Sequence, residues 1–167
     1  HEKKIIHRDI KPSNILIDSY GEPYLTDFGL AKFTDRKSDL TKTEMTLGTP
    51  FYMPPEQVTG SVRLVNSQSD IYSLGIILYQ MLTSKLPFHG NTLPELYNSI
   101  ARGYPEIPNR KKYGSLVDIC YRSIDLKPKK RYKKASEMAK DIELYQTGRE
   151  NQISKVSLLT YLKAYRG

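Results

Sequence analysis

The segment 71–82 constrains the fold of this chain more than any other part of the sequence. Its apolar residues recur at helical spacing and cover nearly every side of the helix that they predict. Such a helix has to be covered by neighbouring elements, so we expect it to lie in the middle of the domain. Ser67, Ser69 and Asp70 are the residues that can cap its start. The segment contains polar residues and falls short of the ~20 apolar residues of a membrane span, so it predicts a buried helix.

The remaining elements are predicted by short apolar runs and by capping residues. Runs at 15–17 and 24–26 predict two β-strands joined by a turn at 18–21. Three further helices are predicted at 92–102, 115–123 and 135–145. Gly148 is a plausible stop after the last of them. The sequence therefore predicts a mainly α fold with one small β-hairpin.

The charge of the chain limits its classes of partner. The formal net charge is +8 at pH 7, and the densest basic stretches are 110–112 and 127–134. They flank prolines and turns, and no zinc-ligand spacing or RNA-recognition motif accompanies them. We interpret them as a solvated surface or a docking face for acidic partners, in preference to a nucleic-acid interface. Cys120, the one cysteine, cannot form an internal disulfide and is predicted to be a core residue.

A polar segment at 7–14 holds the residues that point to chemistry. Phosphoryl transfer depends mainly on positioning and on charge stabilisation. It needs a carboxylate to orient the attacking hydroxyl, a lysine to neutralise the phosphoryl group, and oxygen ligands to hold magnesium. Asp9, Lys11, Asn14 and Asp27 supply these groups in that order. The predicted hairpin returns the chain to its starting edge, so both carboxylates can face one site.

Each of these residues also has a simpler interpretation when it is taken alone. Asp9 could be a turn carboxylate, Asn14 a turn amide and His7 a packed core histidine. Together, however, the segment 7–14 and the later Asp27-Phe28-Gly29 resemble the motifs of the protein kinase family. The lysine two residues after Asp9 resembles the serine/threonine type.

The resemblance implies a protein-kinase-like C-terminal lobe, of class α+β, over 1–150. It divides the lobe into a catalytic loop at 7–14, an activation segment at 27–56 and a helical body at 57–147. No glycine-rich phosphate loop is found in the sequence, so the N-terminal lobe is expected to be absent from it. The tail 151–167 has apolar residues at spacings compatible with a helix.

The resemblance also assigns roles to individual residues. ATP and Mg²⁺ are the implied cofactors, with Asn14 and Asp27 as metal ligands and Lys11 and Leu16 beside the nucleotide. Leu16 corresponds to the floor of the adenine pocket. His7 and Phe28 correspond to members of an apolar spine, and Gly29 gives the turn after Asp27 its flexibility.

Four positions correspond to residues that fix the geometry of the family's catalytic lobe. Thr49 corresponds to a threonine that bridges Asp9 and Lys11. Glu56 follows Pro54-Pro55, where the family usually has Ala-Pro, and is expected to pair with Arg131. Arg131 could instead be solvated among its neighbouring lysines. Asp70 corresponds to the aspartate that holds the backbone of the catalytic loop, and its simpler role is a helix cap.

Arg8 suggests regulation by phosphorylation. We expect its guanidinium to be buried near Asp9 and to bind a phosphorylated residue. Thr41, Thr43 and Thr46 are the candidates, and the first two resemble the paired sites of bacterial receptor-type serine/threonine kinases. An unmodified, solvated loop is the alternative.

The sequence thus predicts a serine/threonine protein kinase that acts on serine or threonine hydroxyls of proteins. The alternative is a non-catalytic pseudokinase-like scaffold, although Asp9, Asn14 and Asp27 are all retained. Without an N-lobe, this chain alone is expected to be inactive. Its interlobe face is expected to bind the missing lobe or to self-associate. The expected location is the cytoplasm, or the cytosolic part of a membrane-tethered kinase.

Overall fold

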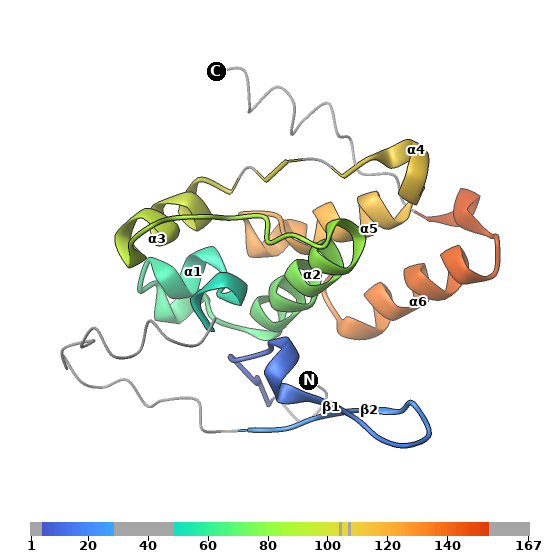
Figure 1. Ribbon diagram of the computed structural model, residues 1–167, viewed down its shortest axis with the longest axis horizontal. Coiled ribbons are helices and arrows are strands. Elements are labelled where there is room, and N and C mark those ends of the chain that lie inside the picture. The colour runs from blue at the N-terminus through green and yellow to red at the C-terminus, as the bar shows by residue number, and fades with distance from the viewer. Residues whose placement is uncertain (1–4, 29–48, 104, 107, 154–167) are drawn as a thin grey trace.

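The computed structural model describes residues 5–28, 49–103, 105–106 and 108–153. A two-stranded hairpin forms one side of the molecule, and helices packed around α2 form the body (Figure 1). The elements follow one another as η1 (Pro12–Asn14), β1 (Ile15–Ile17), β2 (Pro23–Leu25), η3 (Thr49–Tyr52), α1 (Pro55–Val58), η4 (Val62–Leu64), α2 (Ser67–Thr83), α3 (Leu93–Arg102), α4 (Arg110–Tyr113), α5 (Leu116–Ser123), η5 (Pro128–Lys130), α6 (Ala135–Gln146) and η6 (Glu150–Gln152). The predicted class, mainly α with a small hairpin, is confirmed.

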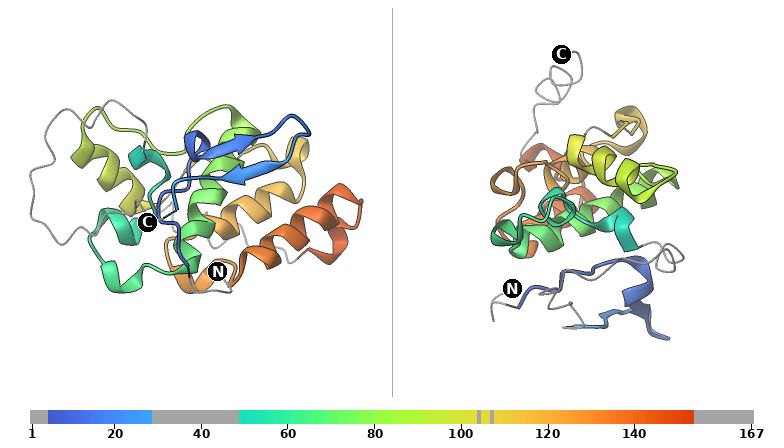
Figure 2. Two further views of the ribbon diagram at one scale, coloured as in Figure 1. Left: turned by 90° about the horizontal axis from the view of Figure 1, so that it is seen from below. Right: turned by 90° about the vertical axis from the view of Figure 1, so that its left-hand side faces the viewer.

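The hairpin is antiparallel and lies across one side of the helical body (Figure 2). Leu16 faces Tyr24 in the register, and the Asp18 carboxylate accepts the backbone N–H groups of Tyr20 and Glu22 to close the turn. The first strand has its predicted bounds, and the second begins and ends one residue earlier than predicted. Leu16, Ile17 and Tyr24 are 57%, 62% and 56% exposed. The hairpin therefore presents an apolar surface to solvent.

Helix α2 lies at the centre of the body, as its apolar pattern predicted. Ile71, Tyr72 and Ile76 are fully buried, and α5 packs along the helix. The prediction of its cap was wrong, because Asn66 is the N-cap. The Asn66 side chain accepts the N–H of Gln68 at 2.7 Å, and Ser69 Oγ accepts the N–H of Asn66 at 3.2 Å. Ser67, Ser69 and Asp70 already belong to the first turn, so none of them can be the residue that precedes it.

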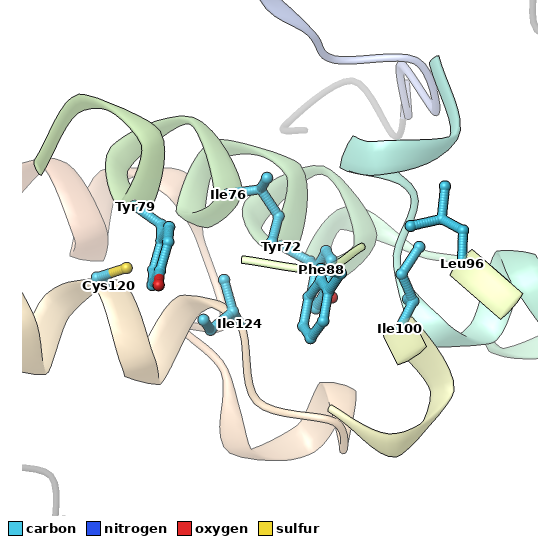
Figure 3. Packing of buried hydrophobic residues seen from close by; sticks show 8 residues of the cluster. All are labelled: Tyr72, Ile76, Tyr79, Phe88, Leu96, Ile100, Cys120 and Ile124. Carbon is cyan, nitrogen blue, oxygen red and sulfur yellow. The ribbon is translucent and has the colours of Figure 1, made fainter. Parts of the chain in front are cut away.

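Two clusters of buried hydrophobic residues join the helices. The first comprises Tyr72, Ile76, Tyr79, Phe88, Leu96, Ile100, Cys120 and Ile124 (Figure 3). Cys120 is fully buried, as predicted. Helices α2 and α5 approach closely at Gly75, where an added Cβ would lie 2.6 Å from Cβ of Ser123 and 2.7 Å from Cγ2 of Ile124. Glycine is required there because no side chain fits between the two helices.

The second cluster joins α2 and α5 to α6. It comprises Ile71, Ile119, Tyr132, Met138, Leu144 and Ile153. Ile153 is 4% exposed and follows η6, so the packed body extends beyond the end of α6. A groove of about 610 Å³ runs between α2 and α6, and Met81 at its edge is 76% exposed. Among the described residues, one side of α2 is thus less covered than its sequence predicted.

The other predicted helices are present with small shifts of their ends. Thr92 caps α3, Leu116–Ser123 forms α5, and α6 is followed by Gly148 with φ of 70°. Two four-residue helices, α1 and α4, were not predicted. Within the described ranges, no helix is both long and apolar enough to span a membrane.

Candidate active site

The backbone of residues 7–9 is held by the buried carboxylate of Asp70, in the first turn of α2. Oδ2 of Asp70 accepts the N–H of His7 and Oδ1 accepts the N–H of Arg8, each at 2.9 Å. The Gln57 side chain donates to the carbonyl of Arg8 at 3.2 Å. Arg8 has φ of 68°, a left-handed conformation that costs free energy in a non-glycine residue. The hydrogen bonds to its N–H and to its carbonyl hold Arg8 in this conformation.

Burial raises the pKa of Asp70, and the hydrogen bonds from the His7 and Arg8 backbone oppose that rise. The carboxylate is 2% exposed and accepts the backbone N–H groups of His7 and Arg8. Asp70 is therefore a support for the loop and not the helix cap, which is Asn66.

His7 connects the loop to the strand that precedes Asp27. It is 2% exposed, and its Nε2 lies 2.7 Å from the carbonyl of Thr26. A carbonyl can only accept, so Nε2 carries the proton and Nδ1 accepts the N–H of Asp9 at 3.3 Å. The ring also packs edge-on against Phe28, with centroids 4.8 Å apart. His7 thus joins the two segments that hold Asp9 and Asp27.

Asp9, Lys11 and Asn14 form one polar cluster. Oδ2 of Asp9 lies 2.9 Å from Nζ of Lys11 and accepts Nδ2 of Asn14 at 3.2 Å. Nδ2 of Asn14 also donates to the backbone carbonyl of Asp9 at 2.8 Å. Within the part of the chain that the structure describes, Oδ1 of Asp9 accepts no hydrogen bond. This arrangement fixes the carboxylate and leaves one of its oxygens accessible to a hydroxyl group.

Asp27 is placed beside this cluster by its neighbour Thr26. The N–H of Thr26 donates to the carbonyl of Asn14 at 2.9 Å, so the chain passes Asn14 immediately before Asp27. Asp27 is exposed and has φ of 61°. Phe28 and Leu16 are also exposed, at 58% and 57%, on this edge of the molecule.

Glu56 and Arg131 form a buried bidentate ion pair. Nη1 and Nη2 of Arg131 lie 2.7 Å and 2.9 Å from Oε1 and Oε2 of Glu56, and Ser69 donates to the same carboxylate. Nε of Arg131 donates to the carbonyl of Asp125 at 2.7 Å. Burial by itself would raise the pKa of Glu56, but the hydrogen bonds and charge of Arg131 hold it below its usual value. The pair ties α1 to the segment after α5.

One expectation about the candidate site was wrong, and several others concern residues that the structure does not describe. Arg8 is exposed rather than buried, because the contacts with Asp70 and Gln57 hold its backbone and not its guanidinium. Gly29 and the candidates for phosphorylation lie outside the described residues, as does most of the tail. The candidates are Thr41, Thr43 and Thr46. The backbone of Thr49 begins η3, and its side chain is not described.

Sequence reasoning missed three residues that support the site. They are Gln57, Thr26 and Ser69. Gln57 follows Glu56 directly and Thr26 precedes Asp27 directly, so adjacency to a motif was the available signal. Their partners are far away in the sequence, and only the folded chain brings them together.

Comparison with known proteins identifies the family. The model of the protein kinase domain matches residues 1–146. The serine/threonine-protein kinase PknD of Protochlamydia amoebophila is 37% identical over 96% of this chain and 18% of its own length. PrkC of Bacillus subtilis is 38% identical over 86% of the chain and 22% of its own, and PknB of Mycobacterium leprae is 34% identical over 93% and 25%. The chain thus spans about a fifth to a quarter of these relatives. With this coverage and identity, the chain belongs to the protein kinase family, of the bacterial serine/threonine type.

Proposed function

We propose that this chain is the catalytic lobe of a protein kinase that transfers the γ-phosphoryl group of ATP to serine and threonine hydroxyls of proteins. The observation that supports this proposal most strongly is the cluster of Asp9, Lys11 and Asn14. Asp70 holds the backbone of the loop on which this cluster lies. Its geometry matches a reaction in which positioning and charge stabilisation supply most of the catalysis.

The cluster suggests a division of labour. Oδ1 of Asp9 accepts the hydrogen bond of the substrate hydroxyl and takes its proton as the hydroxyl oxygen attacks the γ-phosphorus. The bond between this phosphorus and the bridging oxygen breaks, and ADP leaves with the electron pair. Lys11, 2.9 Å from Asp9, adds positive charge beside the transferred group.

The donor atoms at this edge fit Mg²⁺. Asn14 uses its amide nitrogen toward Asp9, which leaves its amide oxygen available, and Asp27 adds an exposed carboxylate. Oxygen ligands suit Mg²⁺, which commonly takes one or two protein ligands and completes its shell with phosphates and water. Among the described residues, no group of three histidine, cysteine or acidic side chains forms a metal site by itself. Bound Mg²⁺ would neutralise charge on the phosphates.

The hairpin is proposed as the nucleotide-facing surface. Leu16 is exposed on β1, two residues after Asn14, and can contact the flat face of an adenine ring. The apolar face of the hairpin is also where an N-terminal lobe or a second copy of this chain would pack.

Regulation by phosphorylation is part of the proposal. Arg8 has an exposed side chain next to Asp9 in the sequence, so its guanidinium is available to bind a phosphate group. The proposed phosphorylation sites are Thr41, Thr43 and Thr46. The sequence predicts a domain over 1–150 and a tail over 151–167, but Ile153 packs in the second core cluster, so the proposed domain runs at least to Ile153. Its proposed setting is the cytoplasmic side of a membrane or the cytoplasm.

The test compares this chain with a version that is extended upstream through an N-terminal lobe. The extended protein should transfer phosphate from Mg-ATP to threonine-containing protein substrates, and Asp9→Asn should abolish transfer. The 167-residue chain should bind Mg-ATP weakly and transfer little phosphate. No transfer by a folded, extended protein would favour the alternative, a non-catalytic scaffold.

A further inference from the structure

One short segment of the body concentrates positive charge on its surface. We call residues 127–134 the lysine loop; it includes η5 and ends at the N-cap of α6. Its five lysines are all exposed, whereas Arg131 and Tyr132 between them are 2% and 1% exposed. The lysines are Lys127, Lys129, Lys130, Lys133 and Lys134. The buried pair anchors the loop and turns its ammonium groups outward.

The backbone of the lysine loop is fixed. Nε2 of Gln68, on α2, donates to the carbonyls of Pro128 and Tyr132 at 2.6 Å and 3.3 Å, which ties both ends of the turn to one side chain. Within the turn, Arg131 N donates to the carbonyl of Pro128 at 2.9 Å. The five charges therefore project from a pre-organised scaffold, and binding of a partner would not have to order it.

Two nearby carboxylates accept backbone N–H groups of the loop and offset part of its positive charge. Asp125 accepts the N–H of Lys127 at 2.8 Å, and Glu137 accepts the N–H of Lys133 at 3.0 Å. No ion pair between described residues includes any of the five lysines. Lys134 also occupies the N-cap of α6 without a side-chain cap, where an uncharged or acidic residue is favoured. Lys134 thus places a positive charge at the start of α6, where the helix disfavours one.

The loop also has a direct connection to the candidate active site. Arg131 binds Glu56 through two hydrogen bonds, and the next residue, Gln57, donates to the carbonyl of Arg8 beside Asp9. A ligand on the loop would therefore sit on a part of the molecule that is rigidly joined to the catalytic residues.

We propose that the lysine loop is a docking site for an acidic segment of the protein substrate. This inference rests on the proposed function and adds a substrate class to it. The lysines project from one short turn, which suits a short acidic peptide. Single-stranded nucleic acid binds through exposed aromatic rings as well as charge, and the aromatic ring of the loop, Tyr132, is buried under Arg122.

The test measures binding of a fluorescein-labelled, glutamate-rich peptide to the 167-residue chain by anisotropy. The double variant Lys129→Glu/Lys130→Glu should bind the peptide about tenfold more weakly than the wild type. The control is Lys111→Glu/Lys112→Glu, which makes the same charge change at exposed positions of α4. It should stay within about twofold of the wild type. Binding by the wild type should weaken as salt rises from about 0.05 M to about 0.3 M.

Three results would overturn the proposal. They are equal weakening by both double variants, no binding of the peptide by the wild type at low salt, and tighter binding to a single-stranded oligonucleotide or to phosphatidylserine vesicles. Thermal unfolding of each variant checks that it is folded. Peptide binding does not involve Asp9, so Asp9→Asn should bind the peptide as the wild type does. Intact docking with no phosphate transfer by the extended protein would count against the proposed function alone.

Discussion

The hairpin and the body around α2 are held in place by different forces. Leu16 and Ile17 on the hairpin are 57% and 62% exposed, whereas Ile71 and Ile76 on α2 are fully buried. Burial of apolar surface stabilises the body, at roughly 25 cal/mol per Å². The hairpin contributes little of that burial, and the loop before it buries one apolar side chain, Ile10, at 5% exposure. Hydrogen bonds from Asp70 and Gln57 hold the backbone of this loop. The difference shows that the edge with the candidate site depends more on polar contacts than the body does.

Two buried carboxylates, Asp70 and Glu56, make polar contacts of different kinds. Asp70 accepts the backbone N–H groups of His7 and Arg8, and Glu56 binds the guanidinium of Arg131. A lost guanidinium leaves a buried charge without its countercharge, whereas a changed Asp70 disturbs mainly the loop. The predictions below distinguish residues that stabilise the helical body from residues that hold the loop 7–14 and the hairpin.

The largest effect is expected from Arg131→Met. It leaves Glu56, 4% exposed, without its ion-pair partner, so the free energy of unfolding should fall by about 3–5 kcal/mol in urea denaturation. Arg149→Met is the matched control, because the Arg149–Glu143 pair is 3.9 Å long and exposed. Its effect should be below ~1 kcal/mol. Similar losses in both variants would contradict the special role of the buried pair.

Gly75→Ala tests the close packing of the body. The new methyl group would lie 2.6 Å from Cβ of Ser123, so α2 and α5 would have to move apart. We expect the free energy of unfolding to fall by about 1–3 kcal/mol, which outweighs the gain of up to ~1 kcal/mol in helix propensity. Thermal and urea unfolding measure it, and a stabilised variant would show that the helices have room there.

Asp70→Asn tests the hydrogen bonds that hold the backbone of His7 and Arg8. An amide can accept one N–H through its oxygen but places its own NH₂ group against the other, so one contact with His7 or Arg8 is lost. The free energy of unfolding should fall by about 1–2 kcal/mol. Hydrogen exchange at the amides of His7 and Arg8 should accelerate more than at Ile124 in the body. Uniform acceleration would mean that Asp70 supports the whole domain.

A pH series sharpens the contrast between the carboxylates. The pKa of Glu56 is lower in the folded chain than its ordinary value of 4.5. Its ionised form therefore stabilises the fold fully above that value, and this contribution is lost as the pH falls through the folded pKa. The difference in unfolding free energy between wild type and Glu56→Gln should shrink as the pH falls below 4.5. A difference that grows in acid would reverse the inferred sign.

The smallest effect on stability is expected at the hairpin surface. Ile17→Ser replaces a side chain that is 62% exposed, so the free energy of unfolding should change by less than ~0.5 kcal/mol. Self-association in sedimentation velocity should nevertheless decrease, because the variant removes exposed apolar surface from the hairpin. Leu64→Ser, at a site that is 54% exposed on η4, is the control and should leave self-association unchanged.

The sequence predicted the body better than its details. Helix α2 was predictable because apolar residues cover most of its surface, but Asn66 was overlooked because three other residues of capping type lie within the next four positions. Helix α4 was missed because its four residues, three basic and one tyrosine, show no apolar periodicity. It depends on the Asn109 side chain at its start.

The sequence predicted the motif residues of the candidate site but not the residues that hold them in place. The segment 7–14 and Asp27 could be found because the kinase motifs are local in sequence. The contact between Gln57 and Arg8 depends on how distant segments pack, and no pattern in the sequence predicts it. The exposure of Arg8 was mispredicted for the same reason, because its backbone contacts come from α1 and α2.

The burial of Ile153 has a practical consequence for anyone who shortens this chain. The family match ends at residue 146, and a truncation at that point would strip Ile153 from the cluster that it shares with Leu144 and Met138. It would also remove Glu150, which accepts the N–H of Ser115 at the start of α5. Limited proteolysis should therefore leave this region uncut through Ile153, and expression boundaries are best set beyond it.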